Sequence, residues 1–294
     1  MKSTATFLLT IGLASASFAQ SAVIMPDDVN NRLVSFDPFD GSLLNTEMFS
    51  LAGNQPVQAM QVGNEIWVTE ELGNRISRWS MTGNPLGEIT GGLQYSYGMA
   101  EIGGNVYVCN SGNGTGSLGI GIVEFDTAGN FLNYFDTPAS QPLSILNYKG
   151  AMLVGSNHQD DDMYVYGLDG TAIGTFHNGS DTNLVEQMAY NMDGKILAAC
   201  HNGGKIAIMS PDDGSFLTSF GPDTGERGVY QLGNGNILFS DNDGAYVYNP
   251  NTFKWNQVYA GSGRYFSLVN PVPEPASFAI LGLGAVALFR RRKR

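Results

Sequence analysis

Residues 55–83 read QPVQAMQVGNEIWVTEELGNRISRWSMTG and contain three short motifs that return along the chain. The first motif (55–63) is an apolar segment that ends in a Gly turn, and the second (64–70) is rich in β-branched and aromatic residues. The third motif (77–83) is a large aromatic or apolar residue followed by a polar turn with Gly. Short apolar segments bounded by Gly and Asn are typical of strands joined by tight turns. The stretch therefore predicts one compact unit of short strands.

The third motif sets the period of the repeat. It recurs at separations of 43, 46, 41, 43 and 39 residues. Its six copies are centred on Phe36, Trp79, Phe125, Tyr166, Met209 and Tyr248. A period of about 40 to 45 residues is typical of a propeller blade of four strands. We predict an all-β, six-bladed β-propeller rather than a two-sheet sandwich, because a sandwich explains short strands and Gly turns but not six copies in register.

The first two motifs precede five of these copies. The second motif returns at 64–70, 105–111, 150–156, 194–200 and 236–241, and the first at 55–63, 97–104, 141–150, 186–194 and 227–235. The sixth set is split between SAVIMPDD at 21–28 and RYFSLV at 264–269. We expect the N-terminal outer strands to pair with this C-terminal inner strand, which closes the ring and removes exposed sheet edges.

The order of the motifs resembles that of NHL-type and gluconolactonase-like six-bladed propellers over residues 21–269. In gluconolactonase-like members a metal ion is held by a Glu, an Asn and an Asp at the entrances of the innermost strands. The resemblance places Gln55, Tyr97, Gln141, Glu186, Arg227 and Arg264 at those entrances. Glu186 is the only carboxylate among them, and a divalent ion needs several oxygen ligands. We therefore expect no hydrolytic metal centre, and regard the ring as a candidate site for a sugar or a carboxylate. The alternative is that Glu186 and Arg227 form an ion pair between blades.

The interior of the chain is strongly acidic. Without Lys2, Glu274 and the five C-terminal cations, 26 acidic and 9 basic residues remain, a net charge near −17. Such a surface repels nucleic acid. Several acidic residues fall in loops on one face of the predicted ring, and a candidate weak calcium site consists of Asp160, Asp161, Asp162, Asp241 and Asp243. The alternative is a solvated acidic loop, because the sequence lacks the spacing of an EF-hand.

No catalytic residue is assigned from the sequence. The three histidines lack the spacing of a helical metal site, and no nucleophile with a base and an orienting group stands out. Cys109 and Cys200 fall two blades apart, which favours two buried thiols over a disulfide.

Both ends of the chain have the features of sorting signals. Residues 1–19 have a basic start, an apolar segment and a small-x-small cleavage site, so we expect a signal peptide. Residues 271–294 contain Val272, Pro273, Glu274 and Pro275, then an apolar run, then the cationic membrane stop formed by Arg290, Arg291, Arg292, Lys293 and Arg294. The uninterrupted uncharged run before Arg290 is only about 12 to 15 residues long, whereas a permanent spanning helix needs roughly 20.

The tail resembles the PEP-CTERM sorting signal of Gram-negative bacteria that make exopolysaccharide. The resemblance implies an exosortase as processing partner, transient insertion in the inner membrane, and then release to the cell surface or the extracellular space. The expected domains are the signal peptide (1–19), the propeller (20–270) and the sorting tail (271–294).

Two functional classes follow from these patterns. The first is an exported, non-catalytic binding or scaffold module that holds exopolysaccharide or matrix proteins. The second is a secreted propeller enzyme, such as a lactonase, lyase or glycosidase, with its site at the axial channel. An enzyme would need convergent acid, base or metal groups on the axis, and the entrances of the inner strands show few of them.

Overall fold

The computed structural model describes residues 21–137, 141–157 and 163–270, and every regular element in these ranges is a β-strand. Residues Ser21–Val269 form one compact unit. The predicted signal peptide and the sorting tail lie outside the described residues.

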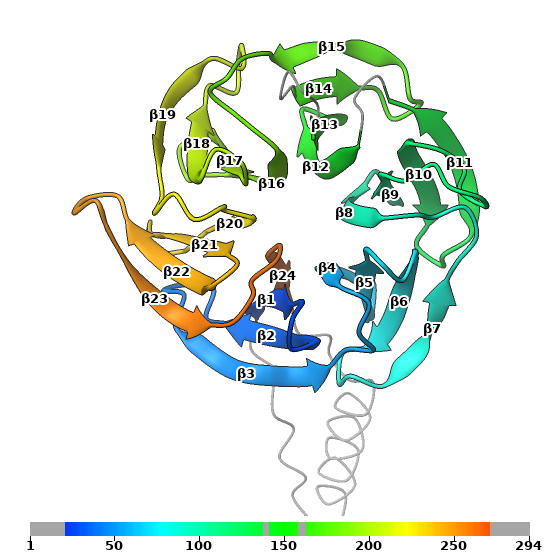
Figure 1. The fold of residues 1–294 in the computed structure, drawn as a ribbon, viewed down its shortest axis with the longest axis horizontal. Coiled ribbons are helices and arrows are strands. Elements are labelled where there is room, and N and C mark those ends of the chain that lie inside the picture. Colours follow the sequence, from blue (N-terminus) through cyan, green and yellow to red (C-terminus); the bar gives the residue numbers. More distant parts are fainter. Residues whose placement is uncertain (1–20, 138–140, 158–162, 271–294) are drawn as a thin grey trace, which may run out of the picture. The chain divides into compact units, whose positions relative to one another are not determined.

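The strands form six antiparallel sheets of four strands each, here called blades, arranged as a ring (Figure 1). Blade 1 consists of β4 (Pro56–Val62), β5 (Glu65–Glu70), β6 (Arg75–Ser80) and β7 (Pro85–Ile89). Blade 2 consists of β8 (Ser96–Ile102), β9 (Asn105–Asn110), β10 (Gly121–Asp126) and β11 (Phe131–Asp136). Blade 3 consists of β12 (Pro142–Tyr148), β13 (Ala151–Ser156), β14 (Met163–Tyr166) and β15 (Ala172–His177).

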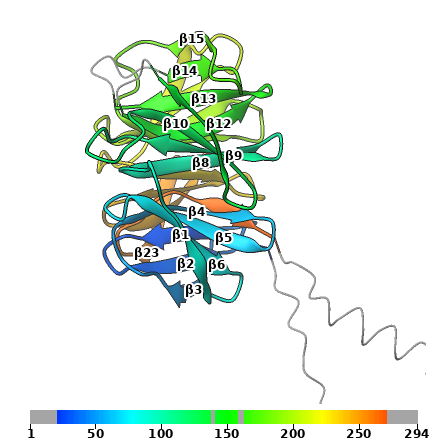
Figure 2. The ribbon, with the colours of Figure 1, turned by 90° about the vertical axis from the view of Figure 1, so that its right-hand side faces the viewer.

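Blade 4 consists of β16 (Val185–Tyr190), β17 (Ile196–Cys200), β18 (Lys205–Met209) and β19 (Phe216–Phe220). Blade 5 consists of β20 (Gly228–Gln231), β21 (Ile237–Asp241), β22 (Gly244–Asn249) and β23 (Lys254–Ala260). In each blade the first strand faces the axis and the last lies on the circumference; Figure 2 shows the ring from its edge. The predicted all-β, six-bladed propeller is confirmed.

The closing blade joins the two ends of the ring. It consists of β24 (Ser267–Val269), β1 (Ala22–Asp27), β2 (Arg32–Phe36) and β3 (Leu43–Ser50), in that order from the axis outward. The pairs Ala22↔Val269 and Ile24↔Ser267 fix the register between β1 and β24. The predicted sharing of this blade between the chain ends is therefore confirmed.

The inner strand of the closing blade is shorter than predicted. The sequence pattern assigned 264–269 to it, but the ladder with β1 covers only Ser267–Val269, apart from an isolated bridge between Asp27 and Gly263. The reason is that the preceding backbone bonds to other blades: the Tyr265 N–H donates to the Val57 carbonyl and the Phe266 N–H to Gln187 Oε1. The segment before β24 accordingly runs toward the centre of the ring (Figure 1).

The hydrophobic core is divided among the blades. Six clusters of buried side chains each lie between two neighbouring blades, for example Trp67 with Val108 between blades 1 and 2, and Phe36 with Leu238 between the closing blade and blade 5. Burying apolar area at about 25 cal/mol per Å² stabilises each junction. Because each blade packs only on its two neighbours, the ring must close for both faces of every blade to be covered.

Buried amides hold the inner strands together around the axis. Gln187 Oε1 accepts hydrogen bonds from the Val229 and Phe266 N–H groups, both at 2.9 Å, and its Nε2 donates to the Phe266 carbonyl at 2.7 Å. Gln58 does the same across blades 1 and 2, where its Oε1 accepts from the Met99 N–H at 2.7 Å. These side chains satisfy backbone groups that no sheet ladder reaches, and so lock three blades to one another at each amide.

Crowding at the axis requires glycine at one position of blade 2. A Cβ on Gly98 would lie 2.7 Å from the Leu143 carbonyl oxygen and 3.4 Å from the ring of Tyr265. Tyr265 is fully buried, and its hydroxyl donates to the Leu143 carbonyl at 3.3 Å. The Tyr265 ring therefore fills the middle of the channel, with a charged cluster on one side of it and an uncharged pocket on the other.

Candidate axial site

A repeated turn brings polar side chains to one mouth of the channel. In four blades the residue before the inner strand is in the left-handed region, and its carbonyl accepts the N–H of the residue that follows the second strand. The φ values are +55° for Gln55, +50° for Tyr95, +59° for Gln141 and +57° for Leu184, and the donors are Glu71, Ser111, Asn157 and His201. The end of each second strand is thereby tied to the entrance of the inner strand.

The residue at the end of the second strand is buried, and the next one faces the axis. Asp27 and Glu70 end their strands with side chains that are almost fully buried. Because successive side chains of an extended chain point to opposite sides, Asp28 and Glu71 are directed to the channel instead. This alternation explains why the mouth is rich in carboxylates.

Arg264 is the centre of the charged group, here called the axial cluster: Asp28, Glu71, Tyr97, Glu186, His201, Arg227 and Arg264. Its Nε donates to Asp28 Oδ2 at 2.6 Å and its Nη2 to Glu71 Oε2 at 3.2 Å. Its Nη1 lies 3.7 Å from Glu186 Oε2. The Arg264 side chain is only 6% exposed, so it is a buried cation surrounded by three carboxylates from three blades.

The electrostatics of the cluster favour the charged form of Arg264. Burial by itself lowers the pKa of the guanidinium, but Glu186, Asp28 and Glu71 outweigh it and raise that pKa. For Tyr97, burial and then the negative charge of the neighbouring Glu71 raise the pKa of the phenol. Tyr97 is therefore a neutral hydrogen-bonding group at neutral pH and Arg264 a permanent cation.

Arg227 and His201 stand at the edge of the cluster. Arg227 Nη1 lies 3.5 Å from Asp28 Oδ2, and His201 Nδ1 lies 3.8 Å from Glu186 Oε1 and 3.1 Å from the Gly225 carbonyl. Their side chains are 14% and 24% exposed, and that of Glu71 is 18% exposed. The cluster therefore has a buried core of ion pairs and a partly exposed polar rim.

Four of the six residues predicted at the entrances belong to this cluster: Tyr97, Glu186, Arg227 and Arg264. Gln55 and Gln141 contribute differently, because Gln55 acts through its backbone carbonyl and the Gln141 amide accepts from the Asn157 side chain at 2.7 Å. The alternative of an ion pair between Glu186 and Arg227 is wrong: Glu186 lies next to Arg264, and Arg227 pairs with Asp28.

Sequence reasoning assigned Asp28 and Glu71 to no site and set His201 aside. Each of the two acidic residues directly follows the second strand of its blade, β1 or β5, and that position in the repeat is the available signal. With them the cluster holds three carboxylates rather than the one expected at the entrances. Arg264 occupies the space between them, and within the described residues no group of three or more His, Cys, Asp or Glu side chains has the arrangement of a metal site.

The candidate calcium site is described only in part. Asp160, Asp161 and Asp162 lie outside the described residues. Asp241 is fully buried, and its Oδ1 accepts the N–H groups of Asp243 and Gly244 at 2.8 and 2.9 Å. These bonds shape the turn between β21 and β22, and calcium binding stays a prediction.

The two cysteines are buried and have free thiols, as predicted. Burial raises the pKa of Cys200 to about 11 and also raises the pKa of Cys109. A protonated, buried thiol is a poor nucleophile.

Comparison with protein families identifies the C-terminal segment. Residues 271–294 match the PEP-CTERM protein-sorting motif, which implies processing by an exosortase and supports export to the cell envelope or surface. Residues 151–242 match the model of the anaphase-promoting complex subunit 4 WD40 domain, a repeat type that builds propeller blades. No curated protein sequence matches the chain. None of the described residues belongs to a helix of the length and hydrophobicity needed to cross a membrane.

Several solved structures share the fold. A nidogen/laminin complex has a chain with 12% identity and a TM-score of 0.69, and the match covers 84% of this chain and 98% of that one. A protein from Bacteroides caccae matches with 13% identity and a TM-score of 0.65, over 85% and 99% of the two chains. A catalytically inactive virginiamycin B lyase from Staphylococcus aureus with quinupristin matches with 16% identity and a TM-score of 0.59, over 86% and 93%. At these identities the likeness concerns the fold alone.

Proposed function

We propose that this protein is an exported propeller that acts at the cell surface or in the extracellular matrix as a non-catalytic binding module for polysaccharide or protein. The PEP-CTERM motif implies export and exosortase processing, and the fold suits display of a rigid binding face. The proposal extends this to a Gram-negative cell that makes exopolysaccharide, with transient inner-membrane insertion of the tail before release.

The observation that carries the binding role is the internal neutralisation of the axial cluster. Asp28, Glu71 and Glu186 all lie within 4 Å of Arg264. Carboxylates that pair with a buried guanidinium are held in place by it, and their oxygens are less available to ligate a metal. Glu71, Arg227 and His201 keep exposed area and offer acceptors and donors to the hydroxyl groups of a glycan or to a polar protein surface.

A pull-down with exopolysaccharide tests this role. Arg227→Ala removes a rim donor, and we expect it to reduce retention of the protein several-fold at constant salt. Arg78→Ala is the matched control, because Arg78 pairs with Glu65 on an outer part of blade 1. If the two variants and the unchanged protein were retained equally, the axial cluster would not take part in polysaccharide binding.

Calcium is proposed as a bridge between the acidic surface and anionic polysaccharide. Affinity in the roughly millimolar range of extracellular calcium modules would follow from a few converging carboxylates. Calorimetry with Ca²⁺ and a pull-down with and without a chelator measure it. Retention that is indifferent to both chelator and salt would contradict bridging and favour direct recognition by the axial cluster.

The sorting claim has a separate test. Replacing Pro273, Glu274 and Pro275 together by Ala should leave export intact but block removal of the tail. Intact-mass spectrometry of the surface protein reads out the result. A mature wild-type protein that still ends at Arg294 would show that the tail is not processed.

One observation favours the second class, a secreted enzyme. His201 and Glu186 lie 3.8 Å apart in the channel mouth, beside the Tyr97 phenol, and such groups could exchange a proton with a substrate. Assays with lactones, uronic-acid polysaccharides and cyclic depsipeptides address it. Turnover that is lost in His201→Gln would replace the binding proposal with an enzymatic one.

A further inference from the structure

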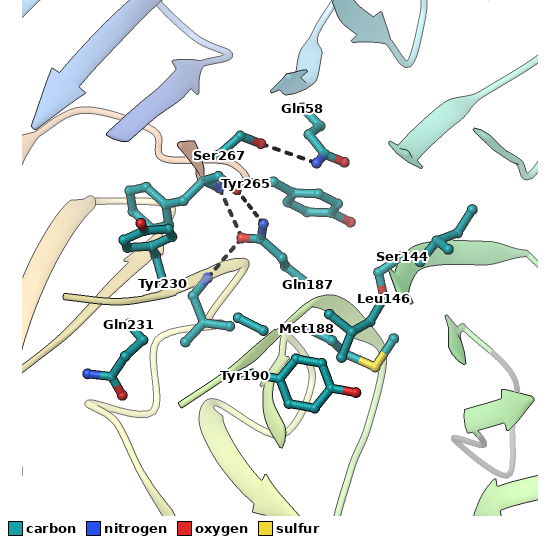
Figure 3. A pocket seen from close by; sticks show the side chains of 14 residues that line it. Gln58, Ser144, Leu146, Gln187, Met188, Tyr190, Tyr230, Gln231, Tyr265 and Ser267 are labelled. Carbon is teal, nitrogen blue, oxygen red and sulfur yellow. Dashed lines mark hydrogen bonds between the residues drawn. The ribbon is translucent and has the colours of Figure 1, made fainter. Parts of the chain in front are cut away.

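A second site lies on the other side of Tyr265. It is a pocket of about 380 Å³ on the axis, formed by inner strands of blades 1, 3, 4 and 5 and of the closing blade (Figure 3). Its volume is near the lower end of the roughly 300 to 1,000 Å³ that small-molecule pockets span. The size suits one ring-sized ligand rather than an extended polymer.

The lining of this axial pocket is polar but uncharged. It contains amides (Gln58, Gln187), hydroxyls (Ser144, Ser267) and phenols (Tyr190, Tyr230), together with the apolar side chains of the inner strands. Within the described residues no charged side chain lines it, although the chain as a whole is strongly acidic. A charged ligand would lose its hydration there without gaining a counterion, so the lining selects neutral molecules.

The walls of the pocket are fixed before any ligand arrives. Gln187 is held by three hydrogen bonds to the backbone of blade 5 and the closing blade. Gln58 is held by the Met99 N–H at 2.7 Å and by Ser267 Oγ at 3.3 Å. A binding site whose polar groups are already oriented loses less conformational entropy on binding.

Hydrogen-bonding capacity nevertheless remains. The Nε2 of Gln58 and of Gln187 each make one of the two donations available to an amide nitrogen. Among the described residues, the hydroxyls of Tyr190 and Tyr230 have no hydrogen-bond partner, and both side chains line the pocket. Tyr190 is 36% exposed, which places its ring at the open end.

We propose that the axial pocket binds one neutral pyranose unit, either a free monosaccharide or the end of a glycan. The sugar hydroxyls would pair with the two phenols and the spare amide N–H groups, and the C–H face of the sugar would stack on the Tyr190 ring. A chain end is favoured over a mid-chain unit, because the buried Tyr265 ring closes the inner end of the pocket.

The test uses the full-length protein and saturation-transfer NMR followed by calorimetry. The neutral probes are methyl α-D-glucopyranoside, methyl β-D-galactopyranoside and N-acetyl-D-glucosamine, and the charged probes are D-glucuronate and D-glucosamine. We expect at least one neutral probe to bind with a Kd on the order of 1 mM, and the charged probes to bind at least about tenfold more weakly. Failure of every neutral probe at millimolar concentration would overturn the proposal, and so would preference for a charged one.

Variants locate the binding. Tyr190→Ala should weaken the best probe about tenfold, and Tyr190→Phe, which keeps the ring, about threefold. Trp255→Ala is the matched control, since Trp255 is a similarly exposed aromatic (42%) on β23 at the circumference. Binding unchanged in both Tyr190 variants would contradict the proposal. Thermal melting accompanies each variant, and if Tyr190→Ala fails to fold, Tyr190→Phe decides alone.

The proposal for the axial pocket and the proposal for the axial cluster can be tested separately. Glu71→Gln alters the cluster on the opposite side of Tyr265, so we expect it to leave monosaccharide affinity within about twofold. A large loss in that variant would mean that the probe binds at the cluster, and the assignment to the pocket would be wrong.

Discussion

Arg264 and Asp28, which are 236 positions apart in the sequence, are joined by a hydrogen bond of 2.6 Å between Nε and Oδ2. Arg264 precedes the innermost strand of the closing blade, and Asp28 follows the second strand of the same blade. The same guanidinium reaches Glu71 of blade 1 and Glu186 of blade 4. One buried cation therefore connects the two ends of the ring to blades on either side of the channel.

Removing that cation should be costly. Arg264→Met would remove the cation shared by Asp28, Glu71 and Glu186 and leave Arg227 beside Asp28 alone. We expect the free energy of unfolding to fall by about 3 to 5 kcal/mol. Urea denaturation measures it. The control Lys149→Met breaks an ion pair with Asp212 whose side chains are 58% and 88% exposed, and should cost less than about 1 kcal/mol. Similar losses in both variants would contradict a buried, coupled cluster.

The amide of Gln187 offers a second test. Gln187→Met keeps the approximate volume but leaves the N–H groups of Val229 and Phe266 and the Phe266 carbonyl without their partner. We expect the free energy of unfolding to fall by roughly 3 kcal/mol. Each unsatisfied buried group costs about 1 to 3 kcal/mol, and relaxation of the surrounding structure recovers part of the sum. The exposed Gln257, which bonds within its own blade, should tolerate the same change with little effect on the melting temperature.

Buried Glu226 makes stability depend on pH. It is fully buried, and both carboxylate oxygens lack a partner among the described residues. Burial, followed by the nearby Asp241, raises the pKa of Glu226 from 4.5 to about 7. A folded state with the higher pKa binds the proton more tightly than the unfolded chain. Proton binding by Glu226 therefore contributes to the free energy of unfolding. This contribution is fully present below pH 4.5 and is lost as the pH rises to about 7.

Glu226→Gln should remove this dependence. At pH 8 we expect the variant to be more stable than the unchanged protein by roughly 3 kcal/mol, and at pH 4 to be equally stable. Thermal melts at both pH values give the comparison. The exposed Glu101→Gln serves as control and should show no such difference. A gain for Glu226→Gln at pH 4 that matches the gain at pH 8 would show that its charge is not the cause.

Truncation tests the closing strand. A chain that ends at Gly263 lacks β24, Arg264 and Tyr265 and leaves β1 with an unpaired edge. We expect it not to fold, because these losses together exceed a typical free energy of unfolding of about 5 to 15 kcal/mol. A chain that ends at Asn270 retains all the described strands and should melt like the full-length protein. Circular dichroism with temperature distinguishes them. A cooperative transition in the shorter chain would show that the ring does not depend on closure.

Much of this fold could be predicted because it is repeated. The six copies of the motif around Phe36 and its equivalents define the blades, and the split sixth set predicts the closing blade. The resemblance to gluconolactonase-like propellers predicts six residues at the entrances. Four of these lie in the axial cluster, whereas Gln55 and Gln141 make other contacts. Asp28 and Glu71 are predictable as acidic loop residues on this face of the ring. They lie one position beyond the second strand, where only the alternation of side chains shows that they face the axis.

Other features depend on contacts that no repeat encodes. Tyr265 and Phe266 leave the ladder because their N–H groups bond to Val57 and Gln187 of other blades. The axial pocket ends at the buried ring of Tyr265, whereas Phe266 packs in the core between the closing blade and blade 5. The depth at which the channel is blocked depends on side chains from several blades at once. It therefore cannot be predicted from the sequence of a single repeat.

The sharing of the closing blade between the two ends also governs when the protein can fold. A chain made from its N-terminus completes five blades while β1, β2 and β3 still lack their innermost partner. The last strand ends at Val269, and the sorting motif begins at residue 271. The strand that closes the ring is therefore made just before the sorting motif, so a chain interrupted before β24 has neither a closed ring nor the motif.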